Sequence, residues 1–350
     1  MTERGADGGL TYRDAGVDRD EAARAKRGIG ALVASTRTAG VLSEAGGFGG
    51  LFRVPAGMRN PVLVSSADGV GTKLKVAMRA GVHDTVGADL VNHCVDDILV
   101  EGARPLFFLD YVGMGQLEAG TVEAVVAGVA RGCRENDCAL LGGETAEMPD
   151  FYAPGEYDLA GFIVGVVEED GRPGAHRVQR GDLLVGIGSD GFHTNGYSLL
   201  RQLFFERMGL DVDDPFPADG VEASVGQVLL RPHRSYAGAV LPLLAEGTVH
   251  ALAHITGGGI LENLDRSIPA GLSARVERGA WPVPAEFRAV AEHGGIGEDE
   301  MMRTFNMGVG MILVVERSVG DSLLARLRES GERAWTIGSV DEGASPVVVT

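Results

Sequence analysis

The 350-residue sequence predicts an α/β (α+β) protein that consists of two domains. The chain is longer than one hydrophobic core usually serves. Apolar strand-like runs alternate with helix-like segments through both halves, which is typical of mixed α and β folds. Between the halves, residues 171–180 are polar and contain Gly, Pro and His, as linkers do. We therefore expect a first domain at residues 1–170 and a second at residues 171–350.

In the first half, the pattern predicts strands at 61–64, 105–112, 139–141 and 158–168, helices at 20–36, 85–102 and 117–133, and either state at 74–78. The helix at 85–102 has the clearest ends, because Asp84 or Thr85 can cap it and Gly102 can end it. Its polar side holds Asp89, Asn92, His93 and Asp96. Asp96 fits a solvated helix face, whereas Asp97 borders the apolar stripe, where a carboxylate is unfavourable unless it is paired or binds a metal.

The second half continues the alternation of strands and helices. We expect strands at 182–187, 251–255, 304–315 and 334–340, helices at 197–208, about 222–246 and 260–266, and loops at 188–196 and 256–259. No internal repeat is visible in the sequence.

Composition and charge exclude several classes of protein. The net charge is −18, and without a basic stripe this excludes broad nucleic-acid binding. The three cysteines form no C-x-x-C pair, so neither a disulfide framework nor a cysteine zinc site is favoured. No apolar run reaches the ~18 residues of a membrane span, and the first ten residues lack a signal-peptide core. We expect a cytoplasmic protein.

A compact group of polar residues follows the strand expected at 61–64. It contains Asp68, Gly69, Gly71, Thr72 and Lys73. Carboxylate, backbone N–H and ammonium groups are those that hold a metal–polyphosphate. The common phosphate loop G-x-x-x-x-G-K-[ST] does not fit, because Lys73 follows Thr72 rather than Gly. A simple Asp-Gly turn between two elements remains the alternative.

Two further carboxylates stand at comparable places. Asp97 lies in the helix expected at 85–102, and Glu144 follows Gly142 and Gly143 at the end of a short strand. Mg²⁺ takes oxygen ligands. Together with Asp68, these carboxylates therefore predict a metal site, although a solvated helix acid and a surface loop remain the alternatives.

Two glycine-containing loops mark the second half. Residues 186–191 fit G-x-G-x-x-G, but five residues separate the third Gly from the next helix, which argues against a dinucleotide-binding fold. His193, Thr194 and Asn195 in this loop can donate hydrogen bonds to a phosphate. The other loop, Thr256 with three glycines, has a high entropic cost that close approach of a ligand would explain. A tight strand–helix turn is the alternative.

Taken together, these segments resemble the phosphoribosylformylglycinamidine cyclo-ligases, also called aminoimidazole ribonucleotide synthetases, of purine biosynthesis. The matching segments are 12–18 (YRDAGVD), 46–49 (GGFG), 68–74 (DGVGTKL), 83–87 (HDTVG), Asp97, 105–111 (PLFFLDY), 142–149 (GGETAEMP), 193–199 (HTNGYSL), 254–259 (HITGGG) and 305–311 (FNMGVGM). They follow the same order along residues 11–340. The segments 142–149 and 193–199 are the most specific.

The resemblance implies an ATP- and Mg²⁺-dependent ring closure of a ribonucleotide substrate, with release of ADP and phosphate. It implies an N-terminal domain whose small mixed sheet pairs across a homodimer, and a C-terminal α/β domain that covers the site. The ATP-binding residues would be Gly46, Gly47, Gly49, Gly50, Asp68, Gly69, Gly71, Thr72 and Lys73, and the metal ligands Asp68, Asp97 and Glu144. His193, Asn195 and His254 would be catalytic, and Thr194, Gly196, Thr256, Gly257, Gly258 and Gly259 would contact substrate or phosphate.

One residue departs from the family pattern in a way that bears on the site. Asp190 stands where the family usually has Ser, which adds a negative charge beside an expected phosphate loop. Two other functions stay open at this point. The chain could be a sibling enzyme of the same superfamily, such as a thiamine-monophosphate kinase, or a non-catalytic nucleotide-binding subunit that works through a partner.

Overall fold

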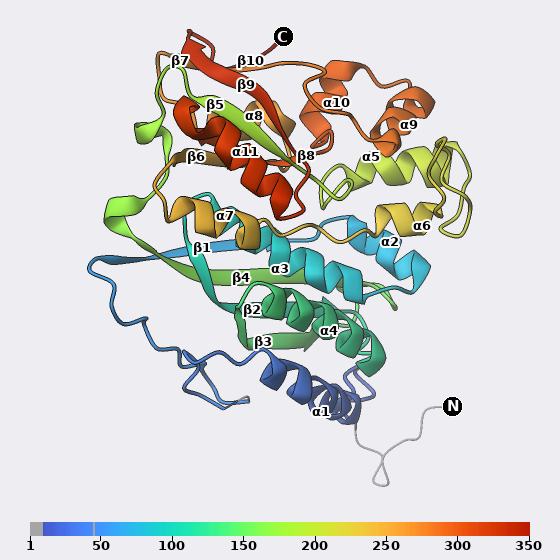
Figure 1. Cartoon of the computed structure of the whole chain (residues 1–350). Coiled ribbons are helices and arrows are strands. Elements are labelled where there is room, and N and C mark those ends of the chain that lie inside the picture. Colours follow the sequence, from blue (N-terminus) through green and yellow to red (C-terminus); the bar gives the residue numbers. More distant parts are fainter. Residues whose placement is uncertain (1–9, 45) are drawn as a thin grey trace.

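The structure, a computed structural model, describes residues 10–44 and 46–350, and Figure 1 shows two halves that are each built around a sheet. The first sheet has the strand order β1-β4-β2-β3. Its strands are β1 (Pro61–Gly69), β2 (Arg104–Met114), β3 (Ala139–Glu147) and β4 (Tyr157–Glu168). β2 and β3 are parallel and the other pairs are antiparallel, so the sheet is mixed, as expected.

Two helices, α3 (Asp84–Leu99) and α4 (Ala119–Glu135), cover one face of this sheet. Two more, α1 (Arg19–Ser35) and α2 (Lys73–Ala80), pack mainly against these and other helices. α3 packs on β1, β4 and β2, α4 packs on α3, β2 and β3, and α1 packs on α4. A side chain at Gly87 or Gly128 would clash with backbone of the facing helix, so these glycines allow α3 and α4 to approach closely.

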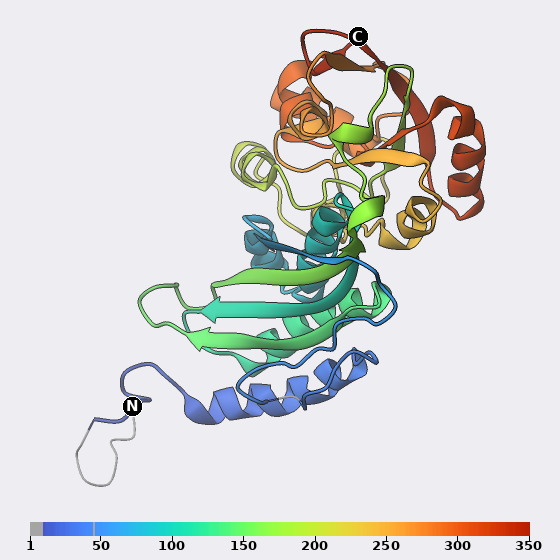
Figure 2. The ribbon, with the colours of Figure 1, turned by 90° about the vertical axis from the view of Figure 1, so that its left-hand side faces the viewer.

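The second sheet has six strands in the order β10-β7-β9-β5-β8-β6. They are β5 (Leu183–Gly188), β6 (Val249–His254), β7 (Leu272–Val276), β8 (Val309–Val315), β9 (Ala334–Glu342) and β10 (Val347–Val349). α11 (Gly320–Glu329) packs on β5 and β9, and α8 (Gly259–Asp265) packs on β6 and β10. Figures 1 and 2 show these two helices on opposite faces of the sheet. Every residue of β8 is buried, because the strand lies inside this layered arrangement.

The remaining helices connect the two halves or extend the second one. They are α5 (Tyr197–Arg201), which continues as a π-helical stretch over Gln202–Arg207, α6 (Val225–Leu229), α7 (Ala237–Leu244), α9 (Ala285–Gly294) and α10 (Glu298–Thr304). Short 3₁₀ turns occupy Glu169–Gly171, Ala175–Arg177 and Arg317–Val319, two of them at the expected linker. In the part of the chain that the structure describes, none of the helices has the length and apolar character needed to span a bilayer.

The expected fold class is confirmed, and four expectations about elements need correction or completion. β1 extends to Gly69 and β3 extends to Glu147, so Asp68 and Glu144 lie within strands rather than in loops. Residues 74–78, which the sequence left undecided, are helical in α2. The strand expected from 304 begins only at Val309, because residues 298–304 form α10.

The helix expected at about 222–246 was wrong. α6 ends at Leu229, and α7 begins at Ala237. Pro232 lies between them, and proline disrupts a helix because it lacks an N–H and its ring clashes with the preceding turn. The intervening segment runs along α3, where the amide N–H of His233 donates to Asp89 and that of Tyr236 donates to Asp96.

The polar side of α3 is not solvated. Its four polar residues are at most 4% exposed, and they are Asp89, Asn92, His93 and Asp96. The second half of the chain covers this side of the helix, so α3 lies between the first sheet and the second domain. The last strand of the first sheet ends at Glu168 and the second sheet begins at Leu183. The boundary between residues 170 and 171 stays a prediction.

Candidate active site at the domain junction

A continuous series of histidines and carboxylates crosses the junction between the two halves. His93 Nε2 lies 2.8 Å from Asp68 Oδ2, and His93 Nδ1 lies 2.6 Å from Thr194 Oγ1. Thr194 Oγ1 also lies 3.3 Å from Nδ1 of His233. His233 Nε2 in turn lies 3.1 Å from His254 Nε2. The junction thus brings the predicted residues Asp68, Thr194 and His254 into one network.

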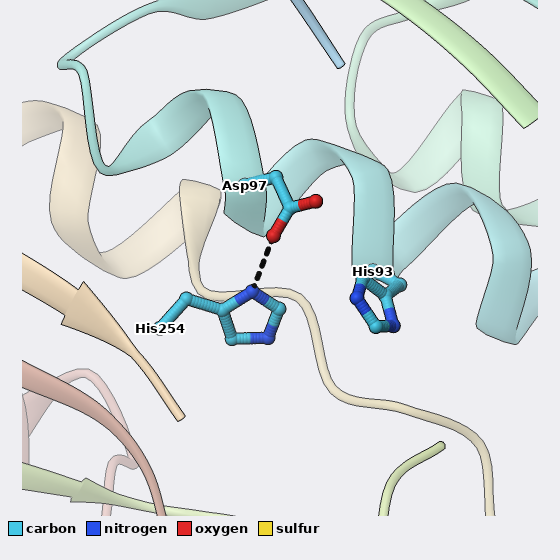
Figure 3. Close-up of side chains that lie close together, drawn as sticks. All are labelled: His93, Asp97 and His254. Atoms are coloured by element: carbon cyan, nitrogen blue, oxygen red, sulfur yellow. Dashed lines mark hydrogen bonds and ion pairs between the residues drawn. The ribbon is translucent and has the colours of Figure 1, made fainter. Parts of the chain in front are cut away.

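The far end of this network is shown in Figure 3, where one ring nitrogen of His254 bonds to Asp97. The distance from His254 Nδ1 to Asp97 Oδ1 is 2.9 Å. Burial lowers the pKa of His254, and the Asp97 carboxylate only partly offsets this effect. Burial would also lower the pKa of His93, but its hydrogen bond to Asp68 and the surrounding carboxylates raise it above the ordinary value.

Two of the three predicted metal ligands are neighbours. Asp68 and Ser66 are two residues apart on β1, so their side chains share the face that meets α3. Ser66 Oγ donates to Asp97 Oδ2 at 3.1 Å, which places Asp97 beside this face. Burial raises the pKa of both acids, but His93 for Asp68 and His254 for Asp97 outweigh it and hold each carboxyl below its ordinary value. Both therefore remain carboxylates near neutral pH.

Glu144 does not join them within one chain, so the three-carboxylate metal site stays a prediction. Asp68 pairs in register with Gly161, then Asp110, then Gly143, across all four strands. Three strand spacings amount to about 14 Å. Glu144 follows Gly143 directly, so its side chain points to the opposite face of the sheet.

The predicted glycine loop lies on the side of Glu144. Gly46, Gly47, Gly49 and Gly50 are exposed, and a side chain at Gly50 would clash with Leu141 of β3. β3 and β1 are the two opposite edges of the four-stranded sheet. The residues that we expected to bind ATP therefore fall into two groups, one at each edge.

Lys73 is not positioned to contact phosphate in this structure. Its side chain is 0% exposed, and its Nζ lies 2.7 Å from Asp89 Oδ2. The ammonium also donates to the carbonyls of His193 and Arg231, at 3.0 and 2.8 Å. These contacts occupy its three donors, because an ammonium has three N–H groups. Lys73 instead ties α2 and α3 to two segments of the second half.

The loop after β5 presents predicted catalytic residues to the junction. His193 is buried with φ +59°, a left-handed conformation that is uncommon for a residue other than Gly and is often found at functional sites. Its ring stacks on His233 at 4.0 Å, and burial holds its pKa well below the ordinary value. Within the described chain, His193 Nδ1 and Asn195 Nδ2 are buried without a hydrogen-bond partner. Neither residue lines the pocket beside Asp97, so the two atoms are buried at the junction behind it.

The glycines of the second loop mainly serve the fold, which corrects our interpretation that a ligand requires all three. Gly258 and Gly259 have φ +90° and +62°, and a side chain on Gly259 would clash with the carbonyl of Met302. Gly196, at φ +79°, would likewise clash with Phe305. Only Gly257 has an ordinary φ, and a Cβ there would lie 3.4 Å from Asn195 Oδ1. The two loops are therefore adjacent at this point.

A polar pocket of about 520 Å³ opens beside Asp97 and His254. Its lining includes Thr256 and the basic side chains of Arg172, His176 and Arg266. This arrangement combines predicted site residues with groups that attract anions.

Asp190, the departure from the family pattern, is neutralised by two arginines. Its carboxylate lies 3.3 Å from Arg234 and 3.2 Å from Arg333. The extra negative charge therefore faces these guanidinium groups, which removes the objection that it would repel a phosphate.

Sequence reasoning assigned no role to several residues of this junction, namely Asp89, His93, Asp96, His233 and Arg266. The signal for the first three was present, because they form the polar side of an otherwise apolar helix. His233 was hidden inside the helix wrongly expected across Pro232. Arg266 follows α8 and carried no recognisable signal before the pocket was visible.

Comparison with known proteins gives this site a family. The family described as "AIR synthase related protein" matches with its N-terminal domain at residues 50–167 and its C-terminal domain at residues 179–350. A phosphoribosylformylglycinamidine cyclo-ligase of Trichlorobacter lovleyi is 51% identical over 331 residues, 94% of both chains. The chain belongs to the phosphoribosylformylglycinamidine cyclo-ligase family. Another member, from Alkaliphilus metalliredigens, is 48% identical over 97% of this chain and 98% of its own.

Solved structures show that the cyclo-ligase family shares its fold with other proteins. A thiamine-monophosphate kinase from Stenotrophomonas maltophilia superposes with a TM-score of 0.65 at 22% identity, over 91% of this chain and 94% of its own. The hydrogenase maturation protein HypE, solved in complex with ATP, gives a TM-score of 0.63 at 23% identity, over 93% and 90%. At these identities the likeness concerns the fold alone.

Proposed function

We propose that this protein catalyses the ATP-dependent cyclisation of formylglycinamidine ribonucleotide to aminoimidazole ribonucleotide, with release of ADP and phosphate. The observation that carries this proposal is the identity of about half of all residues, along nearly the whole chain, with curated cyclo-ligases. The two alternative functions, a sibling kinase and a non-catalytic nucleotide-binding subunit, are supported only by solved structures that are 22–23% identical to this chain. As an enzyme of purine biosynthesis, the protein would act in the cytoplasm, without nucleic acid or membrane as a partner.

The chemistry asks the protein for positioning and charge stabilisation rather than for a nucleophile. The amide oxygen of the substrate accepts the γ-phosphoryl group of ATP, which gives an iminophosphate and ADP. An amidine nitrogen of the same substrate then attacks that carbon, and phosphate leaves as the ring closes. Asn195 Nδ2 and His193 Nδ1 are buried without a partner in the described chain, and they would orient the reacting amide once their loop shifts to admit it.

The substrate phosphate would bind in the pocket beside Asp97. Arg266 and Arg172 supply positive charge there, although Arg172 also pairs with Glu101 at 3.5 Å, and the whole chain has a net charge of −18. In this arrangement, residues 171–350 contribute most of the substrate side and residues 1–170 contribute the ATP side.

ATP and Mg²⁺ would bind at the edge of the four-stranded sheet where Asp68 and Asp97 lie. Both are carboxylates near neutral pH, and both are partly accessible, with 42% and 26% of the side chain exposed. Hard oxygen donors of this kind fit Mg²⁺, which would neutralise charge on the transferred phosphoryl group. Gly69, Gly71 and Thr72 lie next to this edge.

We further propose that the enzyme is a homodimer in which Glu144 and the glycine loop of one protomer complete the ATP site of the other. The outer face of the four-stranded sheet supports this proposal. Its apolar side chains include Leu63 and Phe162, which are 59% and 46% exposed. In register on the same face lie Val164, Phe107 and Leu109. Pairing of two such faces would bury them and bring opposite sheet edges of two protomers together.

A complementation experiment tests this arrangement. Asp68→Asn and Glu144→Gln each remove one carboxylate from opposite edges, and each variant alone should form an inactive dimer. After subunits exchange in an equal mixture, half of the dimers are mixed, and each mixed dimer has one intact site of two. The mixture should therefore regain about one quarter of wild-type activity. No recovery, despite a mixed dimer shown by native mass spectrometry, would contradict the shared site.

The activity itself is tested by measuring ADP release from ATP with formylglycinamidine ribonucleotide present or absent, together with detection of aminoimidazole ribonucleotide. Thiamine monophosphate serves as the control substrate for the sibling kinase. ADP release that depends on thiamine monophosphate, or that does not need any ribonucleotide, would overturn the proposed function.

A further inference from the structure

Three side chains from three different segments meet at the domain junction behind the candidate active site. Asp96 comes from the buried side of α3, His233 from the segment between α6 and α7, and His254 from the end of β6. Their side chains are almost completely buried, at 0%, 0% and 3% exposure. Asp96 belongs to the first half of the chain and the two histidines belong to the second.

Two of the three spacings between their inner atoms match a tetrahedral metal centre. His233 Nε2 lies 3.1 Å from His254 Nε2 and 3.5 Å from Asp96 Oδ2. One donor atom from each of the three residues falls within 4.8 Å of the others. With Zn–N and Zn–O distances of about 2.0–2.2 Å, neighbouring ligand atoms in a tetrahedron are about 3.3–3.5 Å apart.

The outer atom of each side chain is already bound, and this fixes which atom is left for a metal. His254 donates its Nδ1–H to Asp97, as Figure 3 shows, so its Nε2 carries a lone pair that points away from that carboxylate. Asp96 Oδ1 accepts the amide N–H of Tyr236 at 2.9 Å. A metal-binding histidine typically donates its second ring N–H to a carboxylate or another oxygen, and His254 does so here.

The same logic applies to His233. His233 Nδ1 lies 3.3 Å from the Thr194 hydroxyl oxygen, and its Nε2 faces His254 Nε2 at 3.1 Å. In the tautomer of His233 that donates its Nδ1–H to Thr194, the two Nε2 lone pairs point toward the same spot, where a metal ion can bind both.

The third side chain offers an oxygen that has no other use. Asp96 Oδ2 is buried and has no hydrogen-bond partner among the described residues. A buried carboxylate oxygen of this kind is unfavourable unless it is paired or binds a cation, and two imidazole nitrogens lie beside it. We propose that Asp96, His233 and His254 bind a zinc ion that clamps the two domains together, a site beyond the proposed cyclo-ligase function.

The identity of the metal follows from the donor set. Two imidazoles and one carboxylate suit Zn²⁺, whereas Mg²⁺ prefers oxygen ligands and keeps several waters. A second group at the junction, His93, Asp97 and His254, also has closely spaced donor atoms. Its donor atoms are already used, because His93 Nε2 bonds Asp68 and Asp97 Oδ1 bonds His254. Among the described residues, only the first group combines metal spacing with a buried oxygen that lacks a hydrogen-bond partner, Asp96 Oδ2.

The test uses the full-length protein, stripped of metal with a chelator and kept free of nucleotide. We expect titration calorimetry to show one equivalent of Zn²⁺ per chain, and Co²⁺ to give the visible absorption of a tetrahedral complex. Binding should raise the melting temperature, because the ion binds only the folded junction. Excess Mg²⁺ should not displace it, which separates this site from the proposed ATP site.

Variants locate the ion. Asp96→Asn and His233→Gln should each weaken Zn²⁺ binding at least about 100-fold and abolish the rise in melting temperature. The matched control is His250→Gln, because His250 is a buried histidine bonded to Asp182 at 2.7 Å but belongs to no group of three metal-binding side chains among the described residues. This variant should bind Zn²⁺ like the wild type.

Several results would overturn the proposal. If the wild-type protein binds no Zn²⁺ at micromolar concentration, a shared proton rather than a metal lies between the two Nε2 atoms. Binding that persists in both Asp96→Asn and His233→Gln would place the ion elsewhere. If either variant fails to fold, as circular dichroism would show, the wild-type stoichiometry and the other variant still decide the question.

Discussion

The buried ion pair between Lys73 and Asp89 is the junction feature whose loss should be most costly. Both side chains are 0% exposed and their charged atoms lie 2.7 Å apart. Lys73→Met keeps the length of the side chain but removes the ammonium. Among the described residues, the Asp89 carboxylate then keeps only the amide N–H of His233, at 2.5 Å, as a hydrogen-bond partner.

The size of the effect follows from burial. Removal of one partner from a fully buried pair costs about 3–5 kcal/mol, because the other charge stays in a medium of low polarity. The two carbonyls that Lys73 bonds, those of His193 and Arg231, also lose their donor. The double variant Lys73→Met/Asp89→Asn removes both charges and keeps an acceptor for His233, so it should recover most of the loss.

The assay is urea unfolding at a fixed protein concentration, followed by the fluorescence of Trp281 and Trp335, the two tryptophans of the chain. The matched control is Lys75→Met on the same helix. Lys75 pairs with Glu156, and both side chains are 40% exposed, so this change should cost less than about 1 kcal/mol. The reasoning is refuted if Lys73→Met unfolds like Lys75→Met while the KM for ATP rises sharply, because Lys73 would then bind phosphate rather than hold the junction.

Two further predictions follow from single positions. Gly259→Ala should lose at least about 1–2 kcal/mol of stability because of its left-handed φ, and more because of the clash with Met302. The control Gly257→Ala should unfold almost like the wild type. Equal urea midpoints for the two variants would contradict this prediction. Burial raises the pKa of Asp110 to about 7 from an ordinary value near 3.8. The folded state therefore holds a proton that the unfolded state has lost between these pH values, so Asp110 contributes less stability as pH rises through this window. Relative to the wild type, Asp110→Asn should therefore gain stability as the pH rises from 4 to 8, by at most about 4 kcal/mol. If urea unfolding gives the same difference in unfolding free energy between the variant and the wild type at pH 4 and at pH 8, the raised pKa of Asp110 is disproved.

Much of the fold was accessible from local signals in the sequence. The helix around α3 was predicted to within three residues at each end, because capping residues, periodicity and a terminal glycine agree there. β1 and β3 run further than predicted because strand pairing, not composition, extends a strand through residues such as Ser65 and Gly143. Pairing partners lie far away in the chain, so no local pattern reports them.

The candidate site could likewise be predicted where local motifs mark it, but not where it depends on contacts between distant parts of the chain. Asp68, Asp97, Thr194 and His254 were predicted from motifs, and the structure brings these four together. Whether Glu144 joins them depends on the face of a strand and on the width of a sheet, which a motif does not contain. The burial of Asp96 likewise depends on a segment more than 130 residues later in the chain, so an isolated helix pattern made it look solvated.

The ammonium of Lys73 has a consequence for how the two halves of the molecule move. It bonds acceptors from both halves, so a hinge rotation would have to expose a bare charge before any new partner was available. We therefore expect the junction to open only by rare local unfolding, and not by a frequent hinge motion of the two halves. Amide hydrogen exchange should be slow along the buried side of α3 and faster in the loops that border the pocket. We therefore expect ligands to enter and leave through movement of those loops, while the two halves keep their relative orientation.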